Sequence, residues 1–235
     1  GLPKAKRKGL FGLLETKRAD TSPPPFVPAN VGAFSRWRLD MDAAWKNLEK
    51  LLLELSPDVA NMVEFTVGLP GKDKDSNFDF RKSFLSNFGD DMIVYQMPPK
   101  GTALNDIGAG PMVVLVKSPN PDELIKGVGA VPGILPPPLN EAAMLPRRLC
   151  DHTVYGFELA EFHDHSTGEL VKMELLLGDR KGYMAAATDD DLLQAFHEGK
   201  TNGGLAKRDG LAAATALVGG MDSGFFGYQN DRDMV

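Results

Sequence analysis

Two passages of this chain repeat the same order of elements: a strand, a second strand, and a helix with a marked start. In the first passage, MIVYQM and PMVVLVKS precede NPDE, which begins at Asn120 and supplies an N-cap, a first-turn proline and a capping-box acid. In the second, KMELLLGD and GYMAAAT precede TDDD, which begins with Thr188 as N-cap and opens the run DDDLLQAFHEG. We therefore predict an internal duplication in which residues 91–129 and 171–198 form two related strand–strand–helix units.

Further strand and turn signals indicate the fold class. VGAFSRWRLD alternates as a strand does, VYGFELAE and LVKMELLLGD are typical of a hairpin, and SGFFGYQ gives a last strand near the C-terminus. Strands joined by hairpins, with helices between them, predict an α+β fold with a largely antiparallel sheet and helices packed on one face. With 235 residues, 43% of them hydrophobic, the chain has enough apolar side chains for a large core.

Residues 1–30 differ in composition from the rest of the chain. A basic stretch comes first, and TSPPPFVPAN is then typical of an extended proline-rich linker. We predict that this segment has few core contacts. Residues 31–235 are predicted to form a single α+β domain with two related halves, about 31–130 and 140–235.

The basic stretch also permits a second interpretation, a short amphipathic helix that contacts an anionic membrane surface. Its basic and apolar residues are Lys4, Lys6, Arg7, Lys8, Lys17, Arg18, Leu10, Phe11, Leu13 and Leu14. Gly9 and Gly12 interrupt such a helix, so we favour a tail without this function.

Charge and composition argue against several classes of partner. A net charge of -6 gives no general attraction to nucleic acid. No apolar run approaches the roughly 18 residues that a transmembrane helix needs. The single cysteine, Cys150, rules out an intrachain disulfide. The chain begins with Gly and shows no signal peptide, so we expect it to be an excised portion of a longer protein.

The strongest candidate for chemistry is EFHDHSTGEL. In an extended segment Glu161, His163 and His165 share one face of the strand, and two imidazoles with a carboxylate are able to ligate zinc. The other two histidines, His152 and His197, are isolated in the sequence, and no second shell of ligands is evident. We interpret the three residues as the solvated tip of a hairpin, and we expect no catalytic residue, no cofactor and no native metal.

The strand and helix phrases resemble a family of large bacterial proteins that carry a domain of unknown function built from strand–strand–helix units. The resemblance rests on FLSNFGDD, where Gly89 precedes a strand, on a strand with a capped helix at 117–128, and on a glycine, strand and helix at 182–196. It covers about residues 31–230. It implies an exported, envelope-facing protein, and it supplies no catalytic residues to transfer to this chain.

Three functions follow as hypotheses. The first is a non-enzymatic binding or scaffolding module of a larger envelope-associated protein, periplasmic or bound to the cell envelope, with an unidentified protein or envelope component as its partner. The second is a metal-dependent hydrolase that uses Glu161, His163 and His165. The third is a carrier of an apolar ligand, whose sheet would curve over a cavity lined by Met, Phe and Leu.

Overall fold

A computed structural model describes residues 16–68, 78–101, 110–135, 142–163, 170–199 and 204–234, with the backbone alone at 42, 67, 134, 159–163 and 170–173. The strands are β1 (Ala33–Arg38), β2 (Asp91–Gln96), β3 (Met112–Lys117), β4 (Met144–Leu149), β5 (His152–His163), β6 (Leu170–Arg180), β7 (Tyr183–Ala187) and β8 (Phe225–Gln229). The α-helices are α1 (Met41–Leu55), α2 (Pro57–Val67), α3 (Phe80–Ser83), α4 (Pro121–Ala130), α5 (Asp190–Glu198) and α6 (Leu211–Leu217). Short 3-10 helices are η3 (Leu85–Asn87), η5 (Val131–Ile134) and η7 (Leu205–Lys207).

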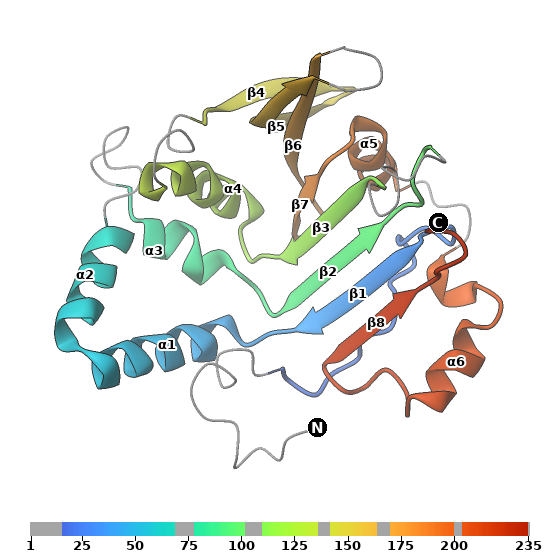
Figure 1. Ribbon diagram of the computed structural model, residues 1–235, viewed down its shortest axis with the longest axis horizontal. Helices are drawn as coiled ribbons and strands as arrows, with labels where there is room; N and C mark the ends of the chain where they lie inside the picture. Colours follow the sequence, from blue (N-terminus) through green and yellow to red (C-terminus); the bar gives the residue numbers. More distant parts are fainter. Residues whose placement is uncertain are drawn as a thin grey trace.

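All described strands form one sheet in the order β4-β5-β6-β7-β3-β2-β1-β8 (Figure 1). Every neighbouring pair is antiparallel, which confirms the predicted α+β fold with an antiparallel sheet. The last strand of the chain, β8, pairs with the first strand, β1, and Trp37 lies opposite Phe225 in this ladder. Strands from the two ends of the chain therefore complete one side of the sheet.

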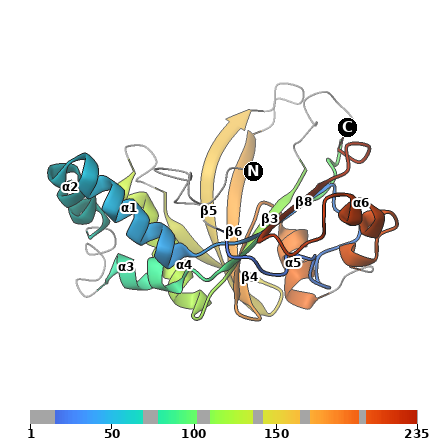
Figure 2. The same cartoon turned by 90° about the horizontal axis from the view of Figure 1, so that it is seen from below.

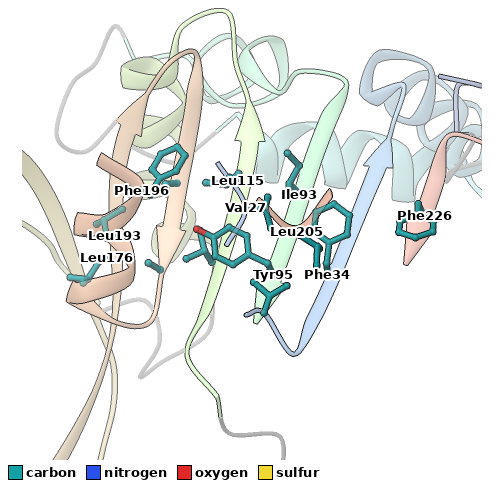
Figure 3. Close-up of a cluster of buried hydrophobic side chains, with 14 of the residues drawn as sticks. Val27, Phe34, Ile93, Tyr95, Leu115, Leu176, Leu193, Phe196, Leu205 and Phe226 are labelled. Carbon is teal, nitrogen blue, oxygen red and sulfur yellow. The ribbon is translucent and has the colours of Figure 1, made fainter. Parts of the chain in front are cut away.

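Two hydrophobic clusters lie on opposite faces of this sheet, because side chains of a strand alternate between faces. One cluster contains Ile93, Leu115 and Ala185 and is covered by α5 through Leu193 (Figure 3). We call this side the strap face, after the N-terminal residues 16–32 that cross it. The other cluster contains Val116, Leu177 and Met184 and is covered by α4. We call this side the α4 face.

Helices therefore pack on both faces, and the prediction of helices on one face was wrong. Figure 2 shows α4 and α5 on opposite sides of β6. The prediction failed because the sheet is buried on both sides where its central strands lie, which short alternating strands do not reveal.

The predicted internal duplication, with its two related halves, is not confirmed. Its two units, β2-β3-α4 and β6-β7-α5, do lie in the same sheet, with β3 beside β7. Their helices nevertheless cover opposite faces. Ser118 and Pro119 link β3 to the N-cap Asn120, whereas Thr188 alone links β7 to the N-cap Asp189. Side-chain direction has a period of two along a strand, so a link longer by one residue is able to send the helix to the other face.

The described part of the N-terminal segment corrects the expectation of few core contacts. Residues 16–32, which we call the strap, cross the strap face, where Val27 and Val31 are fully buried. The Leu205 N–H donates to the Val27 carbonyl at 2.9 Å. Phe26 meets Phe196 edge-on at a centroid separation of 5.9 Å. The strap is thus part of the core, while residues 1–15, including the basic residues of the membrane hypothesis up to Lys8, lie outside the described part.

A buried ion pair fixes the strap to the sheet. Arg36 on β1 donates from Nε and Nη2 to the two carboxylate oxygens of Asp91 on β2, at 2.8 and 2.7 Å. Asp91 is 1% exposed and Arg36 is 7% exposed. The Tyr183 hydroxyl also donates to Asp91, at 2.7 Å, and Arg36 Nη1 donates to the Ser22 carbonyl of the strap, at 2.6 Å.

These contacts determine the charge state of the pair. Burial by itself raises the pKa of Asp91, but hydrogen bonds from Arg36 and Tyr183 and the charges of Arg36 and Arg38 outweigh burial and hold that pKa below its usual range. Burial, the hydrogen bond to Asp91 and the negative charge of that carboxylate raise the pKa of Tyr183. Asp91 is therefore ionised and Tyr183 protonated at neutral pH. The stability from the ionised Asp91 is present above its unfolded-state pKa of about 4 and is lost as the pH falls further.

We predict that Asp91→Asn lowers the free energy of unfolding by about 3–5 kcal/mol at pH 7, because Arg36 would lose its buried counter-charge and keep only the exposed carboxylate of Asp20, at 3.8 Å. Urea denaturation of the variant and the wild type measures the difference. Asp222→Asn, a change at an exposed loop residue, is the control and should shift stability by less than about 0.5 kcal/mol. A loss below about 1 kcal/mol in Asp91→Asn would contradict the role given to the pair.

Candidate functional site

The structure brings only part of the sequence-predicted metal site into view. Glu161 and His163 lie near the end of β5, opposite Lys172 and Leu170 of β6, so the two strands form a hairpin as expected. The side chains of both residues, and the whole of His165, lie outside the described part of the chain. Among the described residues, no group of three His, Cys, Asp or Glu side chains is arranged to hold a metal ion. The expectation of no native metal at these residues remains a prediction, and the metal-dependent hydrolase remains a hypothesis.

The two histidines that the sequence left isolated lie against each other. The rings of His152 and His197 stack at 4.4 Å with an angle of 15° between their planes. Such stacking does not direct ring nitrogens toward a shared ion, because the lone pairs lie in the ring planes. His197 is 6% exposed, and within the described part of the chain both its ring nitrogens lack a hydrogen-bond partner. Gly178 makes room for it, since a Cβ there would lie 2.6 Å from His197 Nε2.

Burial determines the protonation state of His197 at neutral pH. Burial first, and then the charges of His152 and Arg180, lower the pKa of His197 to about 4. The ring is therefore neutral in the folded protein at neutral pH. We interpret the pair as packing between α5 and the β5–β6 hairpin and not as an acid–base site, since neither ring nitrogen of His197 has a partner among the described residues to orient it.

We predict that acid weakens the fold through His197. An unfolded histidine takes up a proton below about pH 6.5, whereas the folded one resists until about pH 4. Stability should therefore fall by about 2 kcal/mol between pH 7 and about pH 4.5 through this group alone. In His197→Phe, urea denaturation at both values should give a smaller loss, by about that amount. An equal loss in the variant and the wild type would refute the assignment.

Cys150 lies in the two-residue turn between β4 and β5. It is exposed and has a left-handed φ of 53°. The turn joins Leu149 to His152, which are partners in the β4–β5 ladder. Nothing in this geometry gives the thiol a nucleophilic role.

The strongest candidate for a binding surface is the part of the α4 face formed by β8, β1 and β2. The hydrophobic cluster of the α4 face, which contains Val116, Leu177 and Met184, covers that face over β3, β7 and β6. Among the described residues, this cluster has no member on β1 or β8. Ala33, Ser35 and Trp37 of β1 project there and are half-buried, and Phe225 and Gly227 of β8 are exposed. We call this region the open face. Its strands run across the front of the molecule in Figure 1.

A hollow of about 370 Å³ lies on the open face. The residues around it are Ala33, Phe34, Ser35, Val94, Tyr95, Gln96, Met112, Gly227, Tyr228 and Gln229. Its cause is local: Ala33, Ser35 and Gly227 carry small side chains or none, and Gly227 lies opposite Ser35 in the β1–β8 ladder. Larger residues at these three positions would fill the space.

Two aromatic rings lie on the same face, two residues from the lining residues Ser35 and Gly227. Trp37 and Phe225 meet edge-on at a centroid separation of 4.8 Å, and Phe225 is 45% exposed. Within the described part of the chain, the buried indole Nε1 of Trp37 has no acceptor.

The Ser35 hydroxyl and the amides of Gln96 and Gln229 add polar groups to the surface. Gln96 Nε2 already donates to the Gly110 carbonyl at 3.0 Å, and Gln229 Nε2 donates to Asp231 at 2.9 Å. The site therefore offers a flat aromatic edge, a depression, the Ser35 hydroxyl and amide oxygens.

Sequence reasoning did not find this hollow. SGFFGYQ predicts a strand, but its partner is β1, almost 200 residues earlier in the sequence. The two strands pair over Ala33 to Trp37 of β1. One signal was present, since a lone glycine inside a strand pattern often marks a close approach or a gap. Gly227 between Phe226 and Tyr228 is such a case.

A second, smaller hollow of about 250 Å³ lies between α1 and α2, beside Trp45, Glu49 and Arg81. Leu55, Met62 and Phe65 leave much apolar surface exposed on the same helices. Trp45 donates to Glu49 at 2.5 Å, and Arg81 also donates to Glu49, so the polar groups beside this hollow are already paired. It is the weaker candidate because it is smaller, about 250 Å³ against about 370 Å³.

Comparisons with known proteins do not identify the chain, because no protein-family model, no curated protein and no solved structure matches it. The resemblance to exported bacterial proteins with a domain of unknown function therefore remains a hypothesis. None of the helices in the described ranges is long and apolar enough to cross a bilayer.

Proposed function

We propose that this chain is a non-enzymatic binding module that recognises a polypeptide on the open face. The observation that carries the proposal is the hollow above Ser35 and Gly227, in a part of the sheet that α4 leaves uncovered. Exposed sheet surface beside exposed aromatic rings is typical of protein interaction sites. On the strength of the family resemblance alone, we propose an envelope-facing location.

The character of the lining favours a polypeptide over an apolar ligand. A carrier of lipid encloses its ligand in an apolar cavity. This hollow instead lies on an open sheet surface and includes the Ser35 hydroxyl and the amides of Gln96 and Gln229. An extended polypeptide presents apolar side chains next to polar peptide groups. Such a ligand fits this lining, because the lining offers both apolar surface and polar groups.

The metal-dependent hydrolase remains a separate hypothesis with its own test. It requires Glu161, His163 and His165 to converge, and the open face contributes none of these residues. Metal analysis of protein purified without a histidine tag decides it, because a native catalytic zinc would be stoichiometric in the wild type and absent from a His163→Ala, His165→Ala double variant.

We predict that Ser35→Phe abolishes recognition at the open face without unfolding the protein. The phenyl ring would occupy the hollow, and an exposed aromatic residue is well tolerated in a strand. Random displayed peptides are selected on wild-type protein immobilised at low density, and the affinity of the recovered peptides is then measured for both proteins. We expect a loss of at least about tenfold, which is roughly 1.4 kcal/mol.

Ser86→Phe is the matched control, because Ser86 is exposed and lies in η3, outside the hollow. It should bind the selected peptides as the wild type does. Amide chemical shifts of the wild type with the best peptide should change at Ser35, Val94 and Gly227. Peptides that bind Ser35→Phe and the wild type equally, changes confined to α1 and α2, or no recovered peptide would each overturn the proposal.

A further inference from the structure

The two edges of the sheet differ in how they are protected against pairing with another chain. The β4 edge, MLPRRL, contains Pro146, which has no N–H to donate, and two arginines. Proline and charged residues are the usual protection of edge strands. The β8 edge, FFGYQ, contains neither. By sequence, the β8 edge is therefore the less protected of the two, and Figure 1 shows α6 beyond it on the side away from β1.

The ladder between β8 and β1 determines which N–H and carbonyl groups of β8 point away from the sheet. The Arg38 N–H donates to the Gly224 carbonyl and the Asn230 N–H donates to the Gly32 carbonyl, each at 2.8 Å. Because antiparallel residues alternate between bonding inward and outward, Phe226 and Tyr228 bond to β1. Phe225, Gly227 and Gln229 consequently direct their N–H and carbonyl groups away from the sheet. The Ser223 hydroxyl donates to the Phe225 carbonyl at 2.5 Å, a bond that an incoming strand would replace.

These outward positions are symmetric about Gly227. Phe225 lies two residues before it and Gln229 two residues after it, and no charged residue occurs between them. A second β8 strand, turned by a twofold axis at Gly227, would place Gly227 against Gly227 and Phe225 against the partner's Gln229. Each facing pair would exchange two backbone hydrogen bonds.

Side chains on the open face match the same arrangement. Phe225, Gly227 and Gln229 all project to that face, since Trp37, Ser35 and Ala33 lie opposite them. The ring of Phe225 is partly exposed and reaches over Gly227, where a Cβ would lie 3.3 Å from its Cζ, and the hollow lies beside Gly227 and Gln229. In the twofold arrangement the partner's Phe225 stands beside Gln229 and diagonally across from Gly227, where the hollow begins.

We propose that the occupant of the open face is a second copy of this chain, paired antiparallel through β8 so that the sheet continues from one copy into the other. This inference rests on the proposed binding function of the open face and names its partner. Each copy supplies Phe225 to the hollow of the other, which makes the contact self-complementary. A closed pair also removes both unprotected edges from solvent.

The test is the molar mass of the purified chain in solution, measured by sedimentation equilibrium between about 1 and 300 µM, since a weak dimer appears only at the upper end. At the upper end we expect twice the 25.5 kDa of one chain. Gly227→Pro should remain monomeric at every concentration. Proline removes the outward N–H of residue 227 and spares the bonds between β8 and β1.

Two further variants keep the result interpretable. Phe225→Lys removes the ring and adds a charge to the edge, and it too should remain monomeric even if Gly227→Pro fails to fold. Val59→Pro places the same new residue in the first turn of α2, which Figure 1 shows at the far end of the molecule from β8, and should dimerise as the wild type does. Circular dichroism confirms that each variant is folded.

A wild type that is monomeric at all concentrations would overturn the self-association. So would a dimer that persists in both Gly227→Pro and Phe225→Lys, because it would use another surface. Neither outcome affects the peptide selection, which uses isolated immobilised copies and Ser35→Phe. Failure of the selection with a β8-dependent dimer present would instead show that the open face accepts its own chain and no other peptide.

Discussion

The buried pair of Arg36 and Asp91 determines which face of β1 must be covered. A guanidinium that is 7% exposed needs acceptors, and it finds them in Asp91 and in the Ser22 carbonyl of the strap. The strap therefore lies on that face, and Val27 and Phe26 extend the core beneath it. Because side chains alternate along β1, Ser35 and Trp37 are then directed to the opposite face, beyond the reach of α4.

The open face and the β8 edge are two aspects of one arrangement. Gly227 supplies no side chain to the open face, so it contributes to the hollow, and its N–H and carbonyl groups point outward from the sheet. Phe225 lies on the same face and stays exposed. A binding surface with both backbone groups and a depression favours an extended segment, in which main-chain bonds give affinity and alternate side chains give selectivity. A second β8 strand meets both demands.

Local chemistry made much of the fold predictable, and distant pairing did not. Asn120 caps its helix as predicted, whereas the cap of α5 is Asp189, one residue after the expected Thr188. Val27 was assigned to a linker because its neighbours are prolines, yet its burial depends on residues as distant as Leu205. The β1–β8 ladder, and with it the hollow, has no local sequence signature, because backbone pairing is indifferent to side-chain identity. Candidate chemistry was therefore sought in histidines, while the strongest site is made by small residues.

The measurement that addresses the central claim most directly is backbone amide exchange along β8 at low and high protein concentration. The amides of Phe226 and Tyr228 bond to β1 and should be protected at both concentrations. Those of Gly227 and Gln229 point outward and should exchange rapidly when dilute and slowly when concentrated. Rapid exchange of Gly227 at both concentrations would contradict recognition through the β8 edge.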